Sequence, residues 1–299
     1  MTKLFTGVAT ALATPMTPNG GIDYDSYRRL LNFQIDAGIN ALIVAGTTGE
    51  GSTLSSEEKL ELLKITLELR GTRDIPVILG TGSNNTLAAI ENTRLAKENG
   101  ADAALIVTPY YNKTSQEGLL AHYYAIADSV DIPIILYNVP GRTGVTILAD
   151  TVVKLADHKN IVGIKDATGS MTYLDSVINN LNDRENFALY SGDDGSFFDF
   201  LAHGGDGVIS VVTNCTPKSF LKEYNLFSQG DISGARKLQQ TLNPFICSLF
   251  ADVSPTPVKA VLNTMGYAGE NFRLPLIATN DTVRQRVIRT YEEVKGLED

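Results

Sequence analysis

The chain has 299 residues, 43% hydrophobic and 20% charged, which is the composition of a globular protein with a large core. Its formal net charge of −9 argues against nucleic acid or an acidic membrane surface as a partner. The two cysteines, Cys215 and Cys247, match neither a disulfide framework nor a zinc pattern. We find no amino-terminal signal and no run near the roughly 18 apolar residues that span a bilayer. We therefore expect a cytoplasmic protein without a metal site.

Short segments typical of buried strands alternate with longer amphipathic segments up to residue 211. This alternation is typical of parallel strands joined by helices. Segments 55–70 and 86–99 show the helical pattern, and a glycine follows each of them. In the first, Leu60, Leu63 and Leu67 form the predicted apolar face. The predicted strands are 8–12, 41–45, 77–80, 103–107, 134–138, 161–165, 187–191 and 207–211.

About eight successive βα units most simply close into a TIM (β/α)8 barrel of the α/β class. A doubly wound sheet would usually carry a glycine-rich nucleotide fingerprint after its first strand, and the sequence has none. Beyond residue 211 the alternation stops, and helices are predicted at 216–230, 232–250, 256–265 and 279–294. We therefore predict a barrel catalytic domain at 1–229 and a C-terminal helical extension at 230–299.

The polar and glycine-rich segments of the chain follow the predicted strands, where the active site of such a barrel lies. They are Gly46-Thr47-Thr48-Gly49-Glu50-Gly51, Thr108-Pro109-Tyr110-Tyr111-Asn112, Tyr137-Asn138-Val139-Pro140-Gly141-Arg142-Thr143-Gly144, Lys165-Asp166 and Ser191-Gly192-Asp193-Asp194. If the barrel closes, all of them face the same rim.

Lys165 ends a segment that otherwise reads as a buried strand. Burial disfavours the charged form of an amine, so such a lysine can attack a carbonyl and form a Schiff base. A lone lysine at a strand end is more often one that extends into solvent. Tyr137, on the preceding predicted strand, has a hydroxyl that could move protons to and from a Schiff base. Arg142, in the loop after that strand, could hold a carboxylate.

Each of the other segments also has a structural interpretation. The glycines around Thr47 and Thr48 suit a tight turn before a helix as well as a carboxylate site. Tyr137 could be a core tyrosine, and Arg142 a surface arginine. Tyr110 and Tyr111 could be an exposed aromatic pair at a subunit contact. The three histidines, His122, His158 and His203, are scattered and are expected on helix faces.

Taken together, three motifs resemble the dihydrodipicolinate synthase and N-acetylneuraminate lyase family of pyruvate-dependent class I aldolases. They are Gly46-Thr47-Thr48-Gly49-Glu50, Tyr137-Asn138-Val139-Pro140-Gly141-Arg142-Thr143 and Gly163-Ile164-Lys165-Asp166. The similarity extends from Phe5-Thr6-Gly7 to Pro257-Val258-Lys259 and so covers nearly the whole chain. The segment around Arg142 resembles the synthase branch, since sialic acid lyases usually lack this arginine.

The resemblance implies that Lys165 forms an imine with pyruvate, which becomes an enamine and attacks aspartate semialdehyde. The product is 4-hydroxy-tetrahydrodipicolinate, on the route to diaminopimelate and lysine. Tyr137, Thr48 and Tyr111 would form the proton relay, and Thr47 and Thr48 would bind the pyruvate carboxylate. Arg142 would receive the carboxylate of the aldehyde. The backbones of Gly192 and Ile209 would line the pocket, and Lys165 itself replaces a cofactor.

The resemblance also implies a homotetramer built from two tight dimers, with Tyr111 reaching across the dimer interface. Regulated members bind lysine at that interface through histidines and a glutamate. The matching positions here are Ser56, Lys59 and Ala88, with Gly51 replacing a common serine, whereas Asn84 and Tyr110 are retained. A cationic Lys59 and a missing carboxylate should weaken binding of an ammonium ligand. We expect weak or absent feedback inhibition by lysine.

Two other functions stay open on the sequence. The first is another pyruvate aldolase of the superfamily, such as a sialic acid or keto-deoxy-sugar acid lyase. The second is a non-catalytic binding protein on the same barrel. The presence of Lys165, Tyr137, Thr48 and Arg142 together argues against the second.

Overall fold

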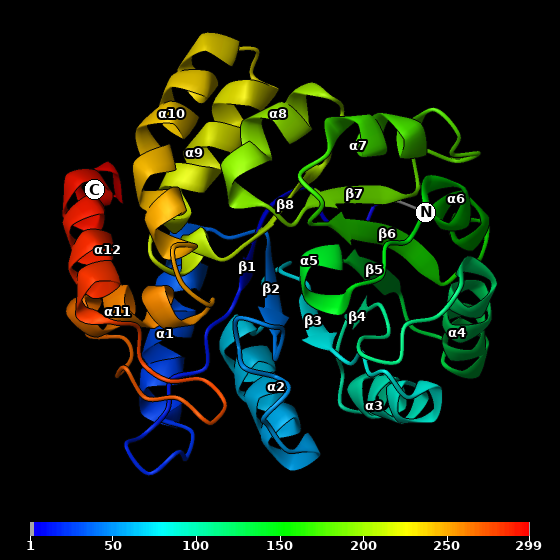
Figure 1. The fold of residues 1–299 in the computed structure, drawn as a ribbon, viewed down its shortest axis with the longest axis horizontal. Coiled ribbons are helices and arrows are strands. Elements are labelled where there is room, and N and C mark those ends of the chain that lie inside the picture. The colour runs from blue at the N-terminus through cyan, green and yellow to red at the C-terminus, as the bar shows by residue number, and fades with distance from the viewer. Residues whose placement is uncertain (1–2, 299) are drawn as a thin grey trace. The chain divides into compact units, whose positions relative to one another are not determined.

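The computed structural model of the protein describes residues 3–298, and its eight strands pair in chain order as a closed barrel (Figure 1). The predicted barrel fold is thereby confirmed. Three predicted strands match in both bounds, and the others differ by one residue at one or both ends. The strands are β1 (Gly7–Ala11), β2 (Ala41–Val44), β3 (Val77–Gly80), β4 (Ala103–Val107), β5 (Ile134–Asn138), β6 (Ile161–Asp166), β7 (Ala188–Ser191) and β8 (Gly207–Ser210).

By compactness the chain divides into two units. The first comprises the residues up to Gly7 together with Pro76–Ile209, and the second comprises Val8–Ile75 together with the residues from Ser210 onward. The C-terminal helices thus belong to the same unit as β1 and β2. Because this division does not separate a barrel from an extension, the domain boundary expected near residue 230 stays a prediction.

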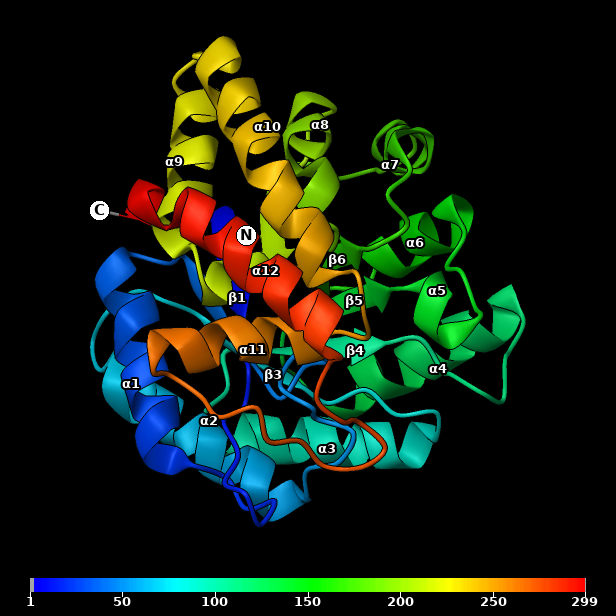
Figure 2. The ribbon, with the colours of Figure 1, turned by 60° about the vertical axis from the view of Figure 1, so that its left-hand side comes forward.

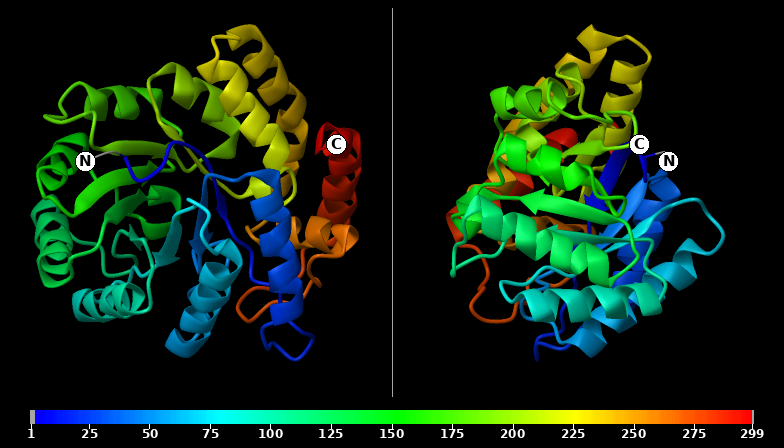
Figure 3. Two further views of the ribbon diagram at one scale, coloured as in Figure 1. Left: turned by 180° about the vertical axis from the view of Figure 1, so that it is seen from behind. Right: turned by 90° about the vertical axis from the view of Figure 1, so that its right-hand side faces the viewer.

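In the first unit, helices pack side by side around the outside of strands β4 to β7 (Figures 1 and 3). Its core is formed where apolar residues of α4, such as Leu119 and Ile126, join strand residues such as Ile106 and Leu136, all with 0% exposure. The helical elements are α3 (Thr86–Glu98), α4 (Gln116–Ser129), α5 (Pro140–Thr143), α6 (Ala149–Ala156), α7 (Met171–Ile178), η1 (Asp194–Ser196) and α8 (Phe197–Ala202).

Strand register in the first unit brings the predicted rim residues onto neighbouring positions. Val107 on β4 pairs with Tyr137 on β5, and Tyr137 pairs with Lys165 on β6. All pairs are parallel, so the carboxyl ends of these strands lie at one edge. Residues in register on adjacent strands face the same side of the sheet, which places the Tyr137 and Lys165 side chains together.

In the second unit, helix α12 lies across α10 and α11 (Figure 2). The hydroxyls of Ser248 and Thr290 form a buried hydrogen bond of 2.7 Å between α10 and α12. The helices predicted after residue 211 are confirmed, with small shifts at their ends. The helical elements are α1 (Tyr24–Ala37), α2 (Ser56–Arg70), η2 (Val212–Asn214), α9 (Pro217–Ser228), α10 (Ile232–Leu249), α11 (Thr256–Met265), α12 (Asp281–Val294) and η3 (Lys295–Glu298).

The buried face of α2 differs from the sequence prediction. Ser55 caps this helix in a capping box with Glu58, which explains its start. Leu63 is buried as predicted, but Leu60 and Leu67 are only half-buried. The buried face of the helix is instead formed by Leu62, Leu63, Ile65 and Thr66. The polar Thr66 can lie on this face because its hydroxyl forms a hydrogen bond with the Tyr27 hydroxyl at 2.9 Å. Within residues 3–298, no helix is long and apolar enough to cross a membrane.

Candidate active site

Lys165 lies at the end of β6, with only 5% of its surface exposed. Its Nζ is 4.5 Å from the centroid of the Tyr137 ring, which is itself 7% exposed. The tyrosine ring therefore forms one wall beside the amine. Among the described residues, no carboxylate is paired with Lys165.

Gly192, after β7, lies directly against the aliphatic part of Lys165. Its N–H donates to the carbonyl of Asp166 at 2.6 Å. A Cβ added to Gly192 would lie 2.9 Å from Cε of Lys165 and 2.9 Å from Cβ of Ala167. Any larger residue at position 192 would therefore collide with the Lys165 side chain in its present conformation. Ile209 is 1% exposed on β8.

Asp166 points to the opposite face of β6 from Lys165, because side chains alternate along a strand. Its carboxylate accepts hydrogen bonds from Nδ2 of Asn138 at 3.0 Å and from the hydroxyl of Thr168 at 2.6 Å. Burial raises the pKa of Asp166 to about 6, against the opposing effect of these donors. Oδ1 of Asn138 in turn accepts the N–H of Ile147 at 3.1 Å. Behind the Lys165 face, a hydrogen-bond network thus ties the ends of β5 and β6 to the segment that follows Arg142.

Arg142 lies on α5, a single turn that begins at Pro140, and the residue is exposed. The neighbouring Thr143 is buried, and its hydroxyl donates to the carbonyl of Val145 at 3.0 Å while it accepts from the hydroxyl of Thr108 at 3.0 Å. These bonds hold the turn to the end of β4. Arg142 is therefore an exposed residue on a turn with a fixed base.

The segment after β4 presents Tyr110 and Tyr111, which are 39% and 93% exposed. Tyr111 has φ of 73°, an unfavourable value for a residue with a Cβ. Nδ2 of Asn84 donates to the carbonyl of Tyr110 at 3.1 Å, and Nδ2 of Asn112 donates to the carbonyl of Asn84 at 2.9 Å. The loop is thus held in a shape that directs the Tyr111 ring away from its own chain.

Thr47 and Thr48 lie in the tight turn after β2, in the second unit. Thr48 is 3% exposed, whereas Thr47 is exposed. Ala45 and Glu50, at either end of the turn, both have φ of 53°. A Cβ at Gly51 would lie 2.0 Å from the carbonyl oxygen of Ala45, so the turn requires glycine there. Backbone strain of this kind persists only where surrounding contacts enforce it, and it often occurs at functional sites.

The structure thus brings Lys165, Tyr137 and Gly192 into contact, while Arg142 and Tyr111 are exposed on adjoining loops. Sequence reasoning gave no role to Asn138, Asp166 or Lys259. Asn138 and Asp166 lie inside the motifs described above. Because side chains alternate along a strand, their positions directly after Tyr137 and Lys165 indicate a contact on the opposite face of the sheet. Lys259 had no local signal, because its partner Glu50 is 209 residues away. In the described part of the chain, no group of three or more histidine, cysteine or acidic residues could hold a metal ion.

The chain is thus a parallel (β/α)8 barrel with a buried lysine beside a tyrosine at the carboxyl end of a strand, where the active sites of barrel enzymes lie. The chain belongs to the dihydrodipicolinate synthetase family, whose model matches residues 4–294.

Relatives at 44–45% identity cover 98% of this chain. A 4-hydroxy-tetrahydrodipicolinate synthase of Exiguobacterium sibiricum is 45% identical over 98% of this chain and 99% of its own length. The Thermotoga neapolitana enzyme of the same name is 44% identical over 98% of both chains. The crystal structure of the Thermotoga maritima dihydrodipicolinate synthase superposes with a TM-score of 0.95 at 41% identity, covering 98% of this chain and 99% of that one. The Acinetobacter baumannii enzyme, solved in complex with pyruvate, has a TM-score of 0.93 at 43% identity, covering 96% and 98%.

Proposed function

We propose that this protein is a lyase that condenses pyruvate with aspartate semialdehyde to give 4-hydroxy-tetrahydrodipicolinate, a step toward diaminopimelate and lysine. The observation that carries the proposal is the buried Lys165 amine, 4.5 Å from the ring of Tyr137. It occurs in a chain whose relatives at 44–45% identity are named as this synthase.

The chemistry needs only an amine, a proton carrier and two carboxylate sites. Nζ of Lys165 attacks the ketone carbon of pyruvate, and loss of water leaves an imine. Removal of a methyl proton gives the enamine, whose carbon attacks the aldehyde carbon of aspartate semialdehyde. The amino group of the bound adduct then displaces Nζ of Lys165 and closes the ring, so the lysine is regenerated and no separate cofactor is consumed.

The other residues serve this sequence of steps. The Tyr137 hydroxyl carries protons to and from the imine, in a relay with Thr48 and Tyr111. Thr47 and Thr48 bind the pyruvate carboxylate, and Gly192 and Ile209 line the pocket. Arg142 receives the carboxylate of the aldehyde through its planar fork.

Tyr111 completes the relay of a neighbouring subunit in a tight dimer, and two dimers form a tetramer. The support is that this ring is 93% exposed on a loop with constrained backbone, and so has almost no packing within its own chain. A structural relative with a TM-score of 0.95 is described as a monomeric dihydrodipicolinate synthase variant. Sedimentation velocity of the purified chain therefore tests the assembly directly. The enzyme works in the cytoplasm, where its two cysteines stay reduced.

Borohydride reduction in the presence of pyruvate, followed by peptide mass mapping, tests the nucleophile. We expect a pyruvate-derived adduct on the Lys165 peptide, and an unmodified peptide would contradict the mechanism and favour a binding protein. A coupled assay that compares aspartate semialdehyde, sialic acid and keto-deoxy-gluconate then tests the substrate. Turnover of a sugar acid in place of the semialdehyde would identify a different aldolase of the superfamily.

A further inference from the structure

A buried ion pair joins the turn of Thr47 and Thr48 to helix α11. Nζ of Lys259 donates to a carboxylate oxygen of Glu50, and both side chains are 0% exposed. Transfer of two charges out of water is costly, and replacing a buried pair with apolar residues is often neutral or stabilising. Its presence therefore calls for an explanation other than stability.

The segment that follows α11 surrounds this ion pair closely. Nζ of Lys259 also donates to the carbonyl of Asn271 at 2.9 Å and lies 4.7 Å from the ring centroid of Phe272. The second carboxylate oxygen of Glu50 accepts the N–H of Arg273 at 3.3 Å. Burial lowers the pKa of Lys259, and the Glu50 carboxylate opposes that shift. The Glu50 carboxylate is thus fixed by donors from two different segments.

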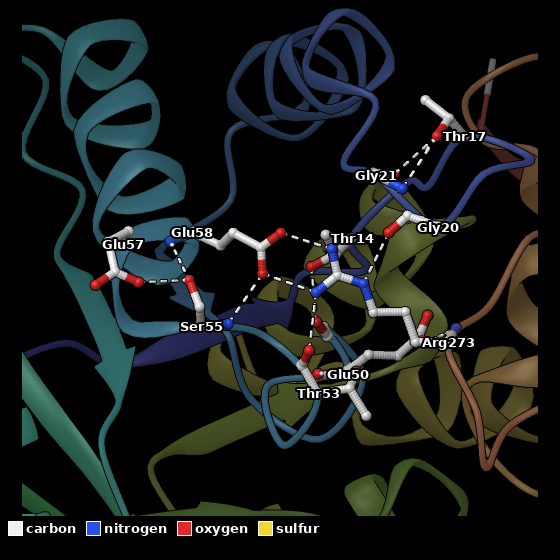
Figure 4. Close-up of polar contacts among 11 residues, drawn as sticks. Thr14, Thr17, Gly20, Gly21, Glu50, Thr53, Ser55, Glu57, Glu58 and Arg273 are labelled. Carbon is white, nitrogen blue, oxygen red and sulfur yellow. Dashed lines mark hydrogen bonds and ion pairs between the residues drawn. The ribbon is translucent and has the colours of Figure 1, made fainter.

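Arg273 extends the same network across the start of α2 (Figure 4). Its guanidinium forms a two-pronged contact with Glu58, at 2.6 and 2.7 Å, and donates to the carbonyl of Thr53 at 2.8 Å. Its Nε donates to the carbonyl of Gly20 at 2.7 Å. Both ends of the segment from Glu50 to Glu58 are therefore held by one segment that follows α11.

The backbone links this network to the two threonines. The N–H of Glu50 donates to the carbonyl of Thr47 at 3.1 Å. The hydroxyl of Thr14 donates to the carbonyl of Gly49 at 2.7 Å. Glu50 itself has φ of 53° and is tied to Thr47 by this backbone hydrogen bond. Loss of the pair would let the turn relax toward an unstrained backbone.

We propose that the Glu50–Lys259 pair is a positioning device that holds Thr47 and Thr48 in place for the pyruvate carboxylate. This inference rests on the proposed function of the two threonines. Glu50 and Lys259 need not touch substrate, because they act through the backbone of the turn.

The test uses three variants of the full chain: Glu50→Gln, Lys259→Met and the two combined. Each single variant leaves one buried charge unpaired, so we expect a clear drop in melting temperature. The double variant removes both charges at similar volume, so its melting temperature should return close to that of the wild type. Pyruvate KM should nevertheless stay about ten- to a hundredfold above wild type in the double variant, since small displacements at a reacting group cost this much. KM for aspartate semialdehyde should change little.

Glu270→Gln is the matched control, because the hydrogen-bond partners of Glu270 in the same unit are Arg284 at 2.8 Å and Asn263 rather than residues of the turn. This variant should keep the wild-type pyruvate KM. A double variant that recovers both stability and pyruvate KM would overturn the positioning role and leave a purely structural pair. Borohydride trapping keeps this outcome separate from the proposed function: if wild type forms no adduct with pyruvate, the function itself fails. If wild type and the double variant reach half-maximal trapping at the same pyruvate concentration, only the positioning role fails.

Discussion

Lys165 and Lys259 are both buried lysines, one in each unit, and they differ in the presence of a counter-charge. Lys259 is paired with Glu50 at 0% exposure, whereas Lys165 lies over the Tyr137 ring with no paired carboxylate in the described part of the chain. A carboxylate contact favours the ammonium form of an amine, which cannot attack a carbonyl. A neutral neighbour that can carry protons, such as the Tyr137 hydroxyl, suits an amine nucleophile better than a carboxylate does. Burial alone therefore does not distinguish the two lysines, whereas the contacts of their amines do.

The largest effect is expected from Lys165→Arg, which keeps a long basic side chain but removes the nucleophilic amine. Turnover should fall by at least about a thousandfold, because no imine can form. Initial rates measure this loss, and borohydride trapping should yield no adduct. Lys159→Arg, at a surface lysine paired with Asp131, is the control and should keep both signals. Substantial turnover in Lys165→Arg would mean that the two buried lysines do not differ as we infer.

Tyr137→Phe should lower kcat by about a hundredfold or more, since a positioned proton carrier contributes roughly that factor. The ring beside Lys165 is retained, so the change isolates the hydroxyl. Pyruvate trapping on Lys165 should persist, though more slowly. A variant with wild-type kcat would show that Tyr137 acts only as a wall of the site.

Arg142→Ala should raise KM for aspartate semialdehyde about ten- to a hundredfold, as expected for loss of a charge-assisted contact with a carboxylate. The half-saturating concentration of pyruvate in trapping should stay near wild type, because Arg142 serves the second substrate. Equal effects on both substrates would assign Arg142 to the pyruvate site instead.

Free lysine should inhibit weakly or not at all. Lys59 is a cation where the regulated pattern has a histidine, and Ala88 replaces its glutamate. A serine at position 51 cannot simply be restored, because its Cβ would lie 2.0 Å from the carbonyl oxygen of Ala45. Initial rates over a lysine titration measure this effect. Strong inhibition at micromolar lysine would contradict the prediction.

The last prediction concerns the stability of the fold and Asp166, which follows Lys165 in the chain and whose carboxyl is held by neutral donors rather than by a cation. Its pKa is raised from 3.8 to about 6, so the folded state binds the extra proton between these values. Stability should therefore fall as pH rises from about 4 to 6, by at most about 3 kcal/mol. Asp166→Asn should remove this fall.

His122 changes the stability with pH in the direction opposite to Asp166. The informative quantity is therefore the difference in stability between Asp166→Asn and wild type at each pH. Burial lowers its pKa to about 4, so stability is lost as pH falls from 6.5 toward 4. This contribution is common to both proteins and cancels in the comparison. Denaturant midpoints measured at several pH values give the difference, and an unchanged pH dependence in Asp166→Asn would assign the slope to other groups.

Much of the fold and part of the candidate site could be predicted from local patterns. The strand segments and their order placed Tyr137 next to Lys165, and the register confirms that pairing. The apolar face of α2 was less predictable, because Thr66 is buried through its hydrogen bond to Tyr27 on another helix. The roles proposed for Thr47, Thr48, Tyr111 and Arg142 stay predictions that the variants above can test.

The sequence by itself determined the alternation of strands and helices, and with it the barrel and the position of Lys165 at a strand end, because these follow from periodicity and chain order. Only the tertiary structure decided which charges are paired. Glu50 meets Lys259 across 209 residues, and Asp166 is held by Asn138 and Thr168. Such pairings depend on three-dimensional proximity, which no local pattern encodes. They also depend on burial, which sets the free-energy cost of a charge.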